Sequence, residues 1–449
     1  MPLTIRVITF NAGRVKLDPK VFASQLFSGP SKSAVSPDIL VLCLQEVAPV
    51  AYSFLGGSYL FPYLQKFEHA VNIAAKSLDG RSFAKAGVKN VGMTAVMIFT
   101  DQDRASRIQS IQYAEVGVGL WGMGNKGAAA IRLKYATDSS EIASLTFVSA
   151  HLAAMEDACG RRNQDYKNIV RGLVFQSASP QASLETSSEV EEAPLLSTAD
   201  RAQKPASDPI SGIYTPASHL IVAGDLNYRT ASNGPSPEER SYFPQPCEDD
   251  SYPQHYEHLL PSDQLAREMR AGKTCQGLKE APIDFPPSYK YSTHARNGVA
   301  TGLVKPEDMD DPTGGKWHWA EHRWPSWCDR VLYLETPSWM EGPGVVVEQY
   351  TALPLMATSD HRPVACTLRI PKEAIPEPSR QDVASGDVQV RPPFSVDPHW
   401  KSKRQAARQR EIIVGILALL TTTWEGLWTV SALVLFGIIL GTGISWWQT

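Results

Sequence analysis

Short runs of apolar, largely β-branched residues recur along most of the chain, and each is bounded by polar or turn residues. Runs of this kind predict buried β-strands, whereas apolar residues about 3.6 positions apart predict a helix. The helical spacing occurs in Arg161–Val174, where Tyr166, Ile169, Val170 and Leu173 share one face. The predicted strands are Thr4–Phe10, Ile39–Leu44, Leu145–Ser149, Leu220–Ala223, Val331–Leu334 and Val364–Leu368.

Polar side chains border these predicted strands repeatedly. An aspartate or histidine in such a place is most often a turn or hydrogen-bonded structural residue, so no single position is decisive. The set as a whole contains one Glu, three Asp, two Asn and two His, and functional residues concentrate on loops at the rim of a rigid sheet. The eight residues are Asn11, Glu46, His151, Asp225, Asn227, Asp329, Asp360 and His361.

Carboxylate and amide oxygens dominate this set, which favours a particular metal. Mg²⁺ takes oxygen ligands and keeps its other positions for water and substrate phosphate. The six cysteines are scattered without a CxxC spacing, so we expect reduced thiols and neither a zinc site nor a disulfide framework. A magnesium site beside a His–Asp pair indicates metal-assisted hydrolysis of a phosphate ester.

Composition narrows the partners and the location. The 449 residues carry 43 basic and 47 acidic side chains, a net charge of −4, which argues against a general nucleic-acid coat. A chain of this length accommodates two or three domains or one large enzyme. Its first residues, MPLTIRVITF, lack a basic stretch followed by an apolar one. We therefore expect neither a secretory signal nor a soluble secreted protein.

The C-terminal segment 411–449 is predicted to be a transmembrane anchor. Leu427–Trp447 has 21 residues without a charged side chain, and as a helix it would extend about 31 Å, close to the hydrocarbon core of a bilayer. The earlier apolar run, Ile412–Trp424, is either half of a hairpin or an interfacial lead-in. Residues 401–410 carry five basic and no acidic residues, so by the positive-inside rule this juxtamembrane flank stays cytosolic. The alternative is a buried C-terminal core helix.

Two further segments contain too little apolar material to form a core. Residues 176–217 combine serines and prolines with an acidic cluster, and we predict a disordered insertion there. Residues 373–400 are rich in proline and are predicted to be a flexible linker. The catalytic domain is thereby assigned to residues 1–372.

Eight ordered segments carry a family resemblance that spans roughly residues 3–370. The chain resembles the inositol polyphosphate 5-phosphatases of the endonuclease/exonuclease/phosphatase superfamily. With its C-terminal segment it is similar to the fungal tail-anchored phosphoinositide 5-phosphatases of the endoplasmic reticulum. The segments are TFNAGR (9–14), LQEV (44–47), GNKGAAAIRL (124–133), FVSAHLAA (147–154), GDLNYR (224–229), SYKY (288–291), WPSWCDR (324–330) and SDHRPV (359–364).

The resemblance implies an α+β fold, a central β-sandwich flanked by helices as in DNase I, and a role for each polar residue. Asp225 would orient or deprotonate the attacking water, with Asn227 pointing to the same side of an extended segment. His361, paired with Asp329, would contact the scissile phosphate as a charged donor. His151 and Asn125 would donate hydrogen bonds to the same phosphate. The residues that would lie around Mg²⁺ are Glu46, Asn11 and Asp360.

The resemblance also implies a substrate. Tyr289, Lys290 and Arg323 match residues that recognise the 4-phosphate next to the scissile 5-phosphate, and Lys126 is a further candidate. Arg suits bidentate phosphate contact, whereas Lys acts as a point charge. The expected substrate is phosphatidylinositol 4,5-bisphosphate at the cytosolic face of a membrane, with the endoplasmic reticulum as the expected location and no nucleic acid as a partner.

Two other functions remain open at this point. A nuclease of the same superfamily would share the Mg²⁺ chemistry, although the negative net charge and the SYKY and WCDR motifs weigh against it. A catalytically idle membrane tether would bind phosphoinositide headgroups through residues 401–410. The presence of Glu46, Asp225 and His361 counts against an idle protein.

Overall fold

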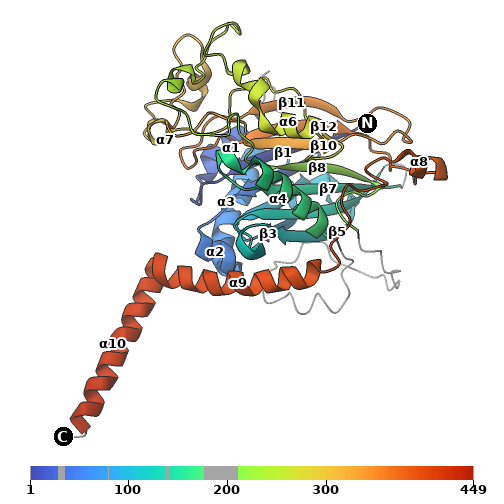
Figure 1. The fold of residues 1–449 in the computed structure, drawn as a ribbon. Coiled ribbons are helices and arrows are strands. Elements are labelled where there is room, and N and C mark those ends of the chain that lie inside the picture. The colour runs from blue at the N-terminus through green and yellow to red at the C-terminus, as the bar shows by residue number, and fades with distance from the viewer. Residues whose placement is uncertain (1, 29–35, 79, 138–140, 176–210, 448–449) are drawn as a thin grey trace, which may run out of the picture.

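Two six-stranded β-sheets packed face to face form the centre of the molecule (Figure 1). The computed structural model describes residues 2–28, 36–78, 80–137, 141–175 and 211–447. The first sheet has the order β11 (Val346–Ala352), β12 (Val364–Ile370), β1 (Leu3–Asn11), β2 (Ile39–Gln45), β4 (Thr94–Asp101) and β3 (Phe83–Val91). The second has the order β5 (Ile108–Gly117), β6 (Gly127–Ala136), β7 (Ile142–His151), β8 (Ser218–Asp225), β10 (Asp329–Leu334) and β9 (Leu278–Lys279).

Alternating side chains of each strand face the two sides of its sheet. On β1, Val7 packs into the core between the sheets, whereas Ile8 packs against the helices outside. Helices α1 (Pro19–Leu26) and α3 (Gly57–Lys76) cover the outer face of the first sheet, and α4 (Cys159–Gly172) covers that of the second. The expected α+β sandwich flanked by helices is confirmed.

The predicted strands are all present, as β1, β2, β7, β8, β10 and β12, and the predicted helix is α4. The shorter helices lie in the connections and are α2 (Val50–Leu55), α6 (Gln264–Arg270), α7 (Thr293–Ala300) and α8 (Arg380–Ser385). Two 3₁₀ turns border the site described below, η2 (Leu120–Gly122) and η3 (Glu156–Ala158).

Of the segment predicted as an insertion, 176–217, residues 176–210 lie outside the described residues. Its last seven residues are packed on the domain, because Ile213 and Tyr214 are buried and Phe175 forms a β-bridge with Ser211. The predicted boundary at 217 is therefore wrong by these residues.

The prediction of a flexible linker at 373–400 is also wrong. Gln389 in this segment is buried and donates a hydrogen bond to the carbonyl oxygen of Ser218 (3.3 Å). Phe394 packs against the hydrophobic cluster on the outer face of the second sheet. Scattered contacts of this kind attach the segment to the domain although its composition is that of a linker.

The C-terminal helices depart furthest from the prediction. Helix α9 (Trp400–Thr422) lies along the base of the domain against α2, and α10 (Trp424–Trp447) points away from it (Figure 1). Among the described residues no single helix has both the length and the hydropathy of a membrane span, but Trp400–Thr422 and Trp424–Phe436 meet the criterion together as a pair bent by 79°.

The predicted basic flank, 401–410, is the first part of the docked helix α9. Arg404 forms an ion pair with Glu115 (2.6 Å), and Lys403 forms one with Asp397 (2.6 Å). Arg408 and Arg410 donate to backbone carbonyl oxygens of Phe54 and Trp121, respectively. Most of the cations expected to face a membrane are thus engaged by the catalytic domain or by Asp397 of the segment before α9.

Candidate active site

Strand register brings three of the predicted catalytic residues, His151, Asp225 and Asp329, into one row across the second sheet. Gly127 of β6 lies opposite His151 of β7, His151 lies opposite Asp225 of β8, and Asp225 lies opposite Asp329 of β10. Each strand ends at or begins from this row, so loops enter and leave there. The row is therefore held by backbone hydrogen bonds of the sheet and does not depend on loop conformation.

Asp225 is the centre of this arrangement. Its Oδ2 accepts a hydrogen bond from the Asn11 side chain (2.9 Å) and lies 3.2 Å from His151 Nε2 and 4.0 Å from His361 Nε2. Burial raises the pKa of Asp225, but His361, His151 and Lys126 outweigh burial and hold the pKa well below its ordinary value. Asp225 is thus a fully ionised carboxylate surrounded by donors.

His361 is held by a second carboxylate. Its Nδ1 lies 2.8 Å from Oδ2 of Asp329, which also accepts a hydrogen bond from the Ser288 hydroxyl (2.7 Å). Burial lowers the pKa of His361, but the carboxylates of Asp329, Asp225 and Asp360 raise it more, to about 9. The imidazole is consequently a cation at neutral pH, with Nε2 directed to the side of Asp225.

Asn227 does not lie on an extended segment, and that expectation is wrong. Its φ is +57°, in the left-handed region, so the chain turns directly after β8. Its side-chain amide donates to the carbonyl oxygen of Leu152 (3.2 Å), and its Oδ1 accepts from Arg229. Asn227 therefore holds the turn behind Asp225, and this geometry was not visible in the sequence.

His151 reaches the site in a different state from His361. It is fully buried, and its Nε2 contacts both Asp225 and the ammonium group of Lys126. Burial and Lys126 lower the pKa of His151, although Asp225 and Glu46 raise it in part. In this geometry the ring supports Asp225, and its contact with the phosphate stays a prediction.

Glu46 and Asn125 lie on loops beside the row. Glu46 has a φ of +47° and forms an ion pair with Arg14 (2.7 Å). Burial raises the pKa of Glu46, but His151, Arg14 and Lys126 together lower it below the ordinary value. The Oδ1 of Asn125 is buried without a hydrogen-bond partner among the described residues, which leaves it available to a bound group.

Three of the predicted substrate-binding residues, Tyr289, Lys290 and Arg323, lie near His361 and His322, whereas Lys126 lies against His151. Tyr289 packs on the His361 ring with 4.5 Å between the ring centres. Lys290 forms an ion pair with Asp360 (2.9 Å), and Arg323 forms one with Glu156 of η3 (2.6 Å). Burial lowers the pKa of His322 most, and the charges of Lys290 and Arg323 lower it further. The two cations therefore lie near the same histidine. Each already has a carboxylate partner with which a phosphate would compete.

The donor set on the other side of the row fits a divalent cation. Glu46 offers a carboxylate and Asn11 an amide oxygen, which are hard ligands suited to Mg²⁺. Burial lowers the pKa of the Lys126 ammonium, and Asp225 and Glu46 offset this effect only in part. Among the described residues, Asp225, Asp329 and His361 also have possible ligand atoms within 4.8 Å of one another. However, His361 and Asp329 are already paired with each other through Nδ1 and Oδ2.

The structure adds residues that sequence reasoning missed. Ser288 holds Asp329, and Arg229 stacks over the Tyr289 ring at 4.3 Å. Glu411 of α9 accepts a hydrogen bond from the amide of Gly124 (2.8 Å), one residue before Asn125. Ser288 and Arg229 lie inside the quoted SYKY and GDLNYR motifs and could have been found there. No sequence signal connected Glu411 to the site.

Comparisons with known proteins agree with this geometry. Residues 8–367 match the Endonuclease/Exonuclease/phosphatase family 2. The chain is 29% identical to type II inositol polyphosphate 5-phosphatase 15 of Arabidopsis thaliana, over 69% of this chain and 26% of that protein. It is 28% identical to polyphosphatidylinositol phosphatase INP53 of Saccharomyces cerevisiae, over 76% of this chain and 24% of that protein. The chain spans about a quarter of the length of these relatives.

A solved structure supports the fold. The inositol polyphosphate 5-phosphatase domain of SPsynaptojanin, in complex with inositol (1,4)-bisphosphate and a calcium ion, superposes with a TM-score of 0.56. The alignment covers 91% of this chain and 93% of that domain at 22% identity, so it shows a common architecture. With most of its length matched, the chain belongs to the endonuclease/exonuclease/phosphatase family 2 and is related to the inositol polyphosphate 5-phosphatases.

Proposed function

We propose that this chain is a Mg²⁺-dependent 5-phosphatase that acts on phosphatidylinositol 4,5-bisphosphate. The observation that carries the proposal is the pairing of His361 with Asp329 beside the ionised carboxylate of Asp225. A cationic donor and a carboxylate on one site suit hydrolysis of a phosphate monoester, since one contacts phosphoryl oxygens while the other accepts a proton from water. The names of the related proteins support this reaction class.

Asp225 is the group that we assign to the attacking water. Asn11 and His151 orient its carboxylate through contacts with Oδ2. Asp329 holds Nδ1 of His361, which leaves the Nε2 proton for a phosphoryl oxygen. Because both groups are buried and fixed, their charges are aligned before substrate arrives, and such preorganisation is a large part of electrostatic catalysis.

Glu46 and Asn11 are the groups that we assign to Mg²⁺, with Asp360 as a third candidate. When bound, the ion would neutralise phosphate charge and favour ionisation of water. Asp360 lies beside Lys290, on the substrate side of His361, so its carboxylate also sets the charge that a second phosphate meets.

Recognition of the 4-phosphate is assigned to Tyr289, Lys290 and Arg323, with Lys126 closer to the scissile group. Lys290 and Arg323 are partly exposed and flank His322. A phosphate that displaces Asp360 or Glu156 from one of them would gain a charge-assisted hydrogen bond.

The proposal includes a membrane location, with the catalytic domain on the cytosolic face and the endoplasmic reticulum as the organelle. The support is the uncharged stretch Leu427–Trp447 and the exposed apolar residues of α9 beside it, which are Ile412, Ile413, Ile416 and Leu417. Fractionation of cells followed by protease treatment of intact vesicles tests this location. A catalytic domain protected from protease would contradict it.

The activity is tested by phosphate release from nanodiscs that contain phosphatidylinositol 4,5-bisphosphate. We expect release with Mg²⁺, loss with a chelator and recovery on readdition, and no release from phosphatidylinositol 4-phosphate, which lacks the 5-phosphate. An abasic DNA duplex in parallel reports nuclease activity. Cleavage of the duplex without lipid turnover would overturn the proposal in favour of a nuclease.

A further inference from the structure

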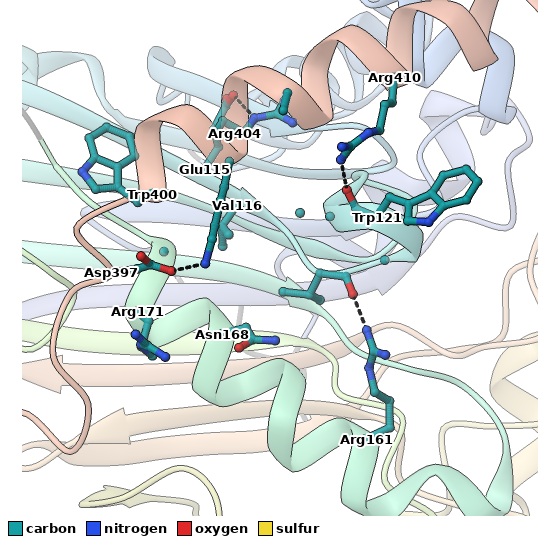
Figure 2. Close-up of a pocket in the computed structure, with 17 residues that line it drawn as sticks. Glu115, Val116, Trp121, Arg161, Asn168, Arg171, Asp397, Trp400, Arg404 and Arg410 are labelled. Carbon is teal, nitrogen blue, oxygen red and sulfur yellow. Dashed lines mark hydrogen bonds and ion pairs between the residues drawn. The ribbon is translucent and has the colours of Figure 1, made fainter.

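A cavity lies between α9, α4 and the end of β5, with a volume of about 430 Å³ (Figure 2). None of the catalytic residues assigned above lines it. Helix α4 contributes one wall, α9 the opposite wall, and the η2 turn closes one end. Volumes of this size accommodate small polar ligands.

The lining is strongly basic. Five cationic side chains and two carboxylates contribute to it, a formal excess of three positive charges. The carboxylates are already satisfied: Glu115 by Lys89 (2.5 Å) and Arg404 (2.6 Å), and Asp397 by Lys403 (2.6 Å). They are therefore poor partners for the cations that remain.

Two arginines on opposite walls form no ion pair with a carboxylate among the described residues, although Lys403 and, to a smaller extent, Arg171 lower the pKa of Asp397. Arg171 of α4 has neither a hydrogen bond nor an ion pair from its guanidinium there, and Arg410 of α9 donates only to the carbonyl oxygen of Trp121 (2.9 Å). The fifth cation, Arg161, is neutralised by Asp165 (2.6 Å). Arg171 and Arg410 thus leave most of their donors free in the cavity.

We propose that this cavity binds a phosphomonoester group, as an inositol phosphate headgroup carries it. Two planar guanidinium groups with free donors suit the oxygens of a phosphate, which each can contact through two hydrogen bonds. The rings of Trp121 and Trp400 give the cavity apolar surface for the ring or glycerol part of such a ligand. Asn168 adds an amide for a hydroxyl group.

The surroundings indicate how a lipid would reach the cavity. Leu120 and Trp121 of η2 are 60% and 67% exposed. Ile413 and Leu417, farther along α9, are also largely exposed. An apolar surface next to a basic cavity is typical of a protein that rests on an anionic bilayer. The same phosphate chemistry is present in soluble inositol phosphates, so the experiment must separate the two sources.

The test measures binding to the full chain without turnover. The site that remains in the cavity variant is the proposed active site, so loss of the cavity site and failure of the proposed function give different site counts. Calorimetric titration of the chain in neutral detergent with inositol 1,4-bisphosphate gives the number of sites. We expect two sites for the wild type and one for Arg171→Ala/Arg410→Ala, with the affinity of the lost site reduced at least about tenfold. Lys401→Ala is the matched control, because Lys401 is an exposed cation of α9 outside the cavity.

A second arm uses phosphatidylcholine nanodiscs with and without phosphatidylinositol 4-phosphate. Binding that depends on this lipid and is weakened by Arg171→Ala/Arg410→Ala identifies a membrane headgroup, whereas two sites for the soluble probe without a lipid effect identify a soluble ligand. One site in the wild type together with lipid binding equal in all variants would overturn the proposal. Thermal unfolding of each variant verifies that it is folded.

Discussion

The carboxylate of Glu411 accepts a hydrogen bond from the backbone amide of Gly124 at 2.8 Å, although the two residues are 287 positions apart. Glu411 is fully buried and also pairs with Arg404 (2.8 Å). Gly124 packs so closely on Gly92 that an added Cβ would lie 2.7 Å from the Gly92 nitrogen. Helix α9 therefore supports the loop that presents Asn125 and Lys126.

Replacement of Glu411 by alanine should weaken the whole domain. The change leaves the Gly124 amide and one face of Arg404 buried without their acceptor, and broken buried ion pairs cost about 3 kcal/mol. We expect the free energy of unfolding to fall by this order, measured by denaturant titration, and turnover of a soluble inositol phosphate to fall with it. Glu373→Ala, at an exposed glutamate, is the control. Equal stability of the two variants would contradict the role of Glu411.

Two truncations separate α9 from α10. A chain that ends after Thr423 keeps the docked helix, so it should retain the stability and the soluble-substrate activity of the full chain. A chain that ends before Trp400 exposes Phe54 and Leu55, on which α9 packs, and loses Glu411. It should unfold at lower temperature and turn over more slowly. Indistinguishable activity of the two truncated chains would show that α9 is only a tether.

Asp225→Asn should abolish turnover and preserve substrate binding. The variant keeps the size of the side chain but removes the base that we assign to water, a role worth about 10²–10⁴ in rate. Single-turnover kinetics and calorimetric binding distinguish the two effects. More than about a tenth of wild-type activity would contradict the assignment.

Lys290→Ala should raise KM mainly for substrates with a 4-phosphate. The lysine pairs with Asp360 and is assigned to the 4-phosphate and not to the scissile phosphate, so kcat should change little. Kinetics with 5-phosphate substrates that have or lack the 4-phosphate provide the test. Lys279→Ala, at a surface ion pair with Glu335, is the control. Equal losses on both substrates would exclude the proposed recognition.

The pH dependence of kcat/KM should reveal the ionisation of His361. Because its pKa is raised to about 9, the cation persists at neutral pH, and kcat/KM should fall as pH rises toward that value. A bound divalent cation disfavours the charged ring, so 9 is an upper bound for this limb. Asp329→Asn removes the carboxylate that raises the pKa most and should move the limb to lower pH. An unchanged limb in this variant would assign it to another group.

The sequence alone was sufficient for some of the strands at the centre of each sheet. β1, β2, β7 and β8 are buried on both faces and appear as continuous apolar runs. β5, at the edge of its sheet, is half-buried with polar residues throughout, and no run distinguishes it from a loop. Periodicity therefore identified the strands that carry His151, Asp225 and Asp329, but it missed the interior strands β4 and β6 as well as the edge.

The candidate site was predictable as a set of residues but not as a geometry. The motifs placed Asp225, Asp329 and His361 together, and the structure confirms that they meet. The turn at Asn227 and the docking of α9 depend on contacts between distant segments, such as Arg404 with Glu115. A basic stretch before an apolar one has the same composition whether its charges face lipids or carboxylates, so only tertiary structure could separate the two.

The row of Gly127, His151, Asp225 and Asp329 has a consequence for how such proteins diversify. Neighbouring backbones fix the reacting groups, whereas the candidates for substrate choice, Lys290 and Arg323, come from irregular connections outside the strands. A lineage can therefore lengthen or exchange those connections and acquire new substrates while it inherits the hydrolytic chemistry intact.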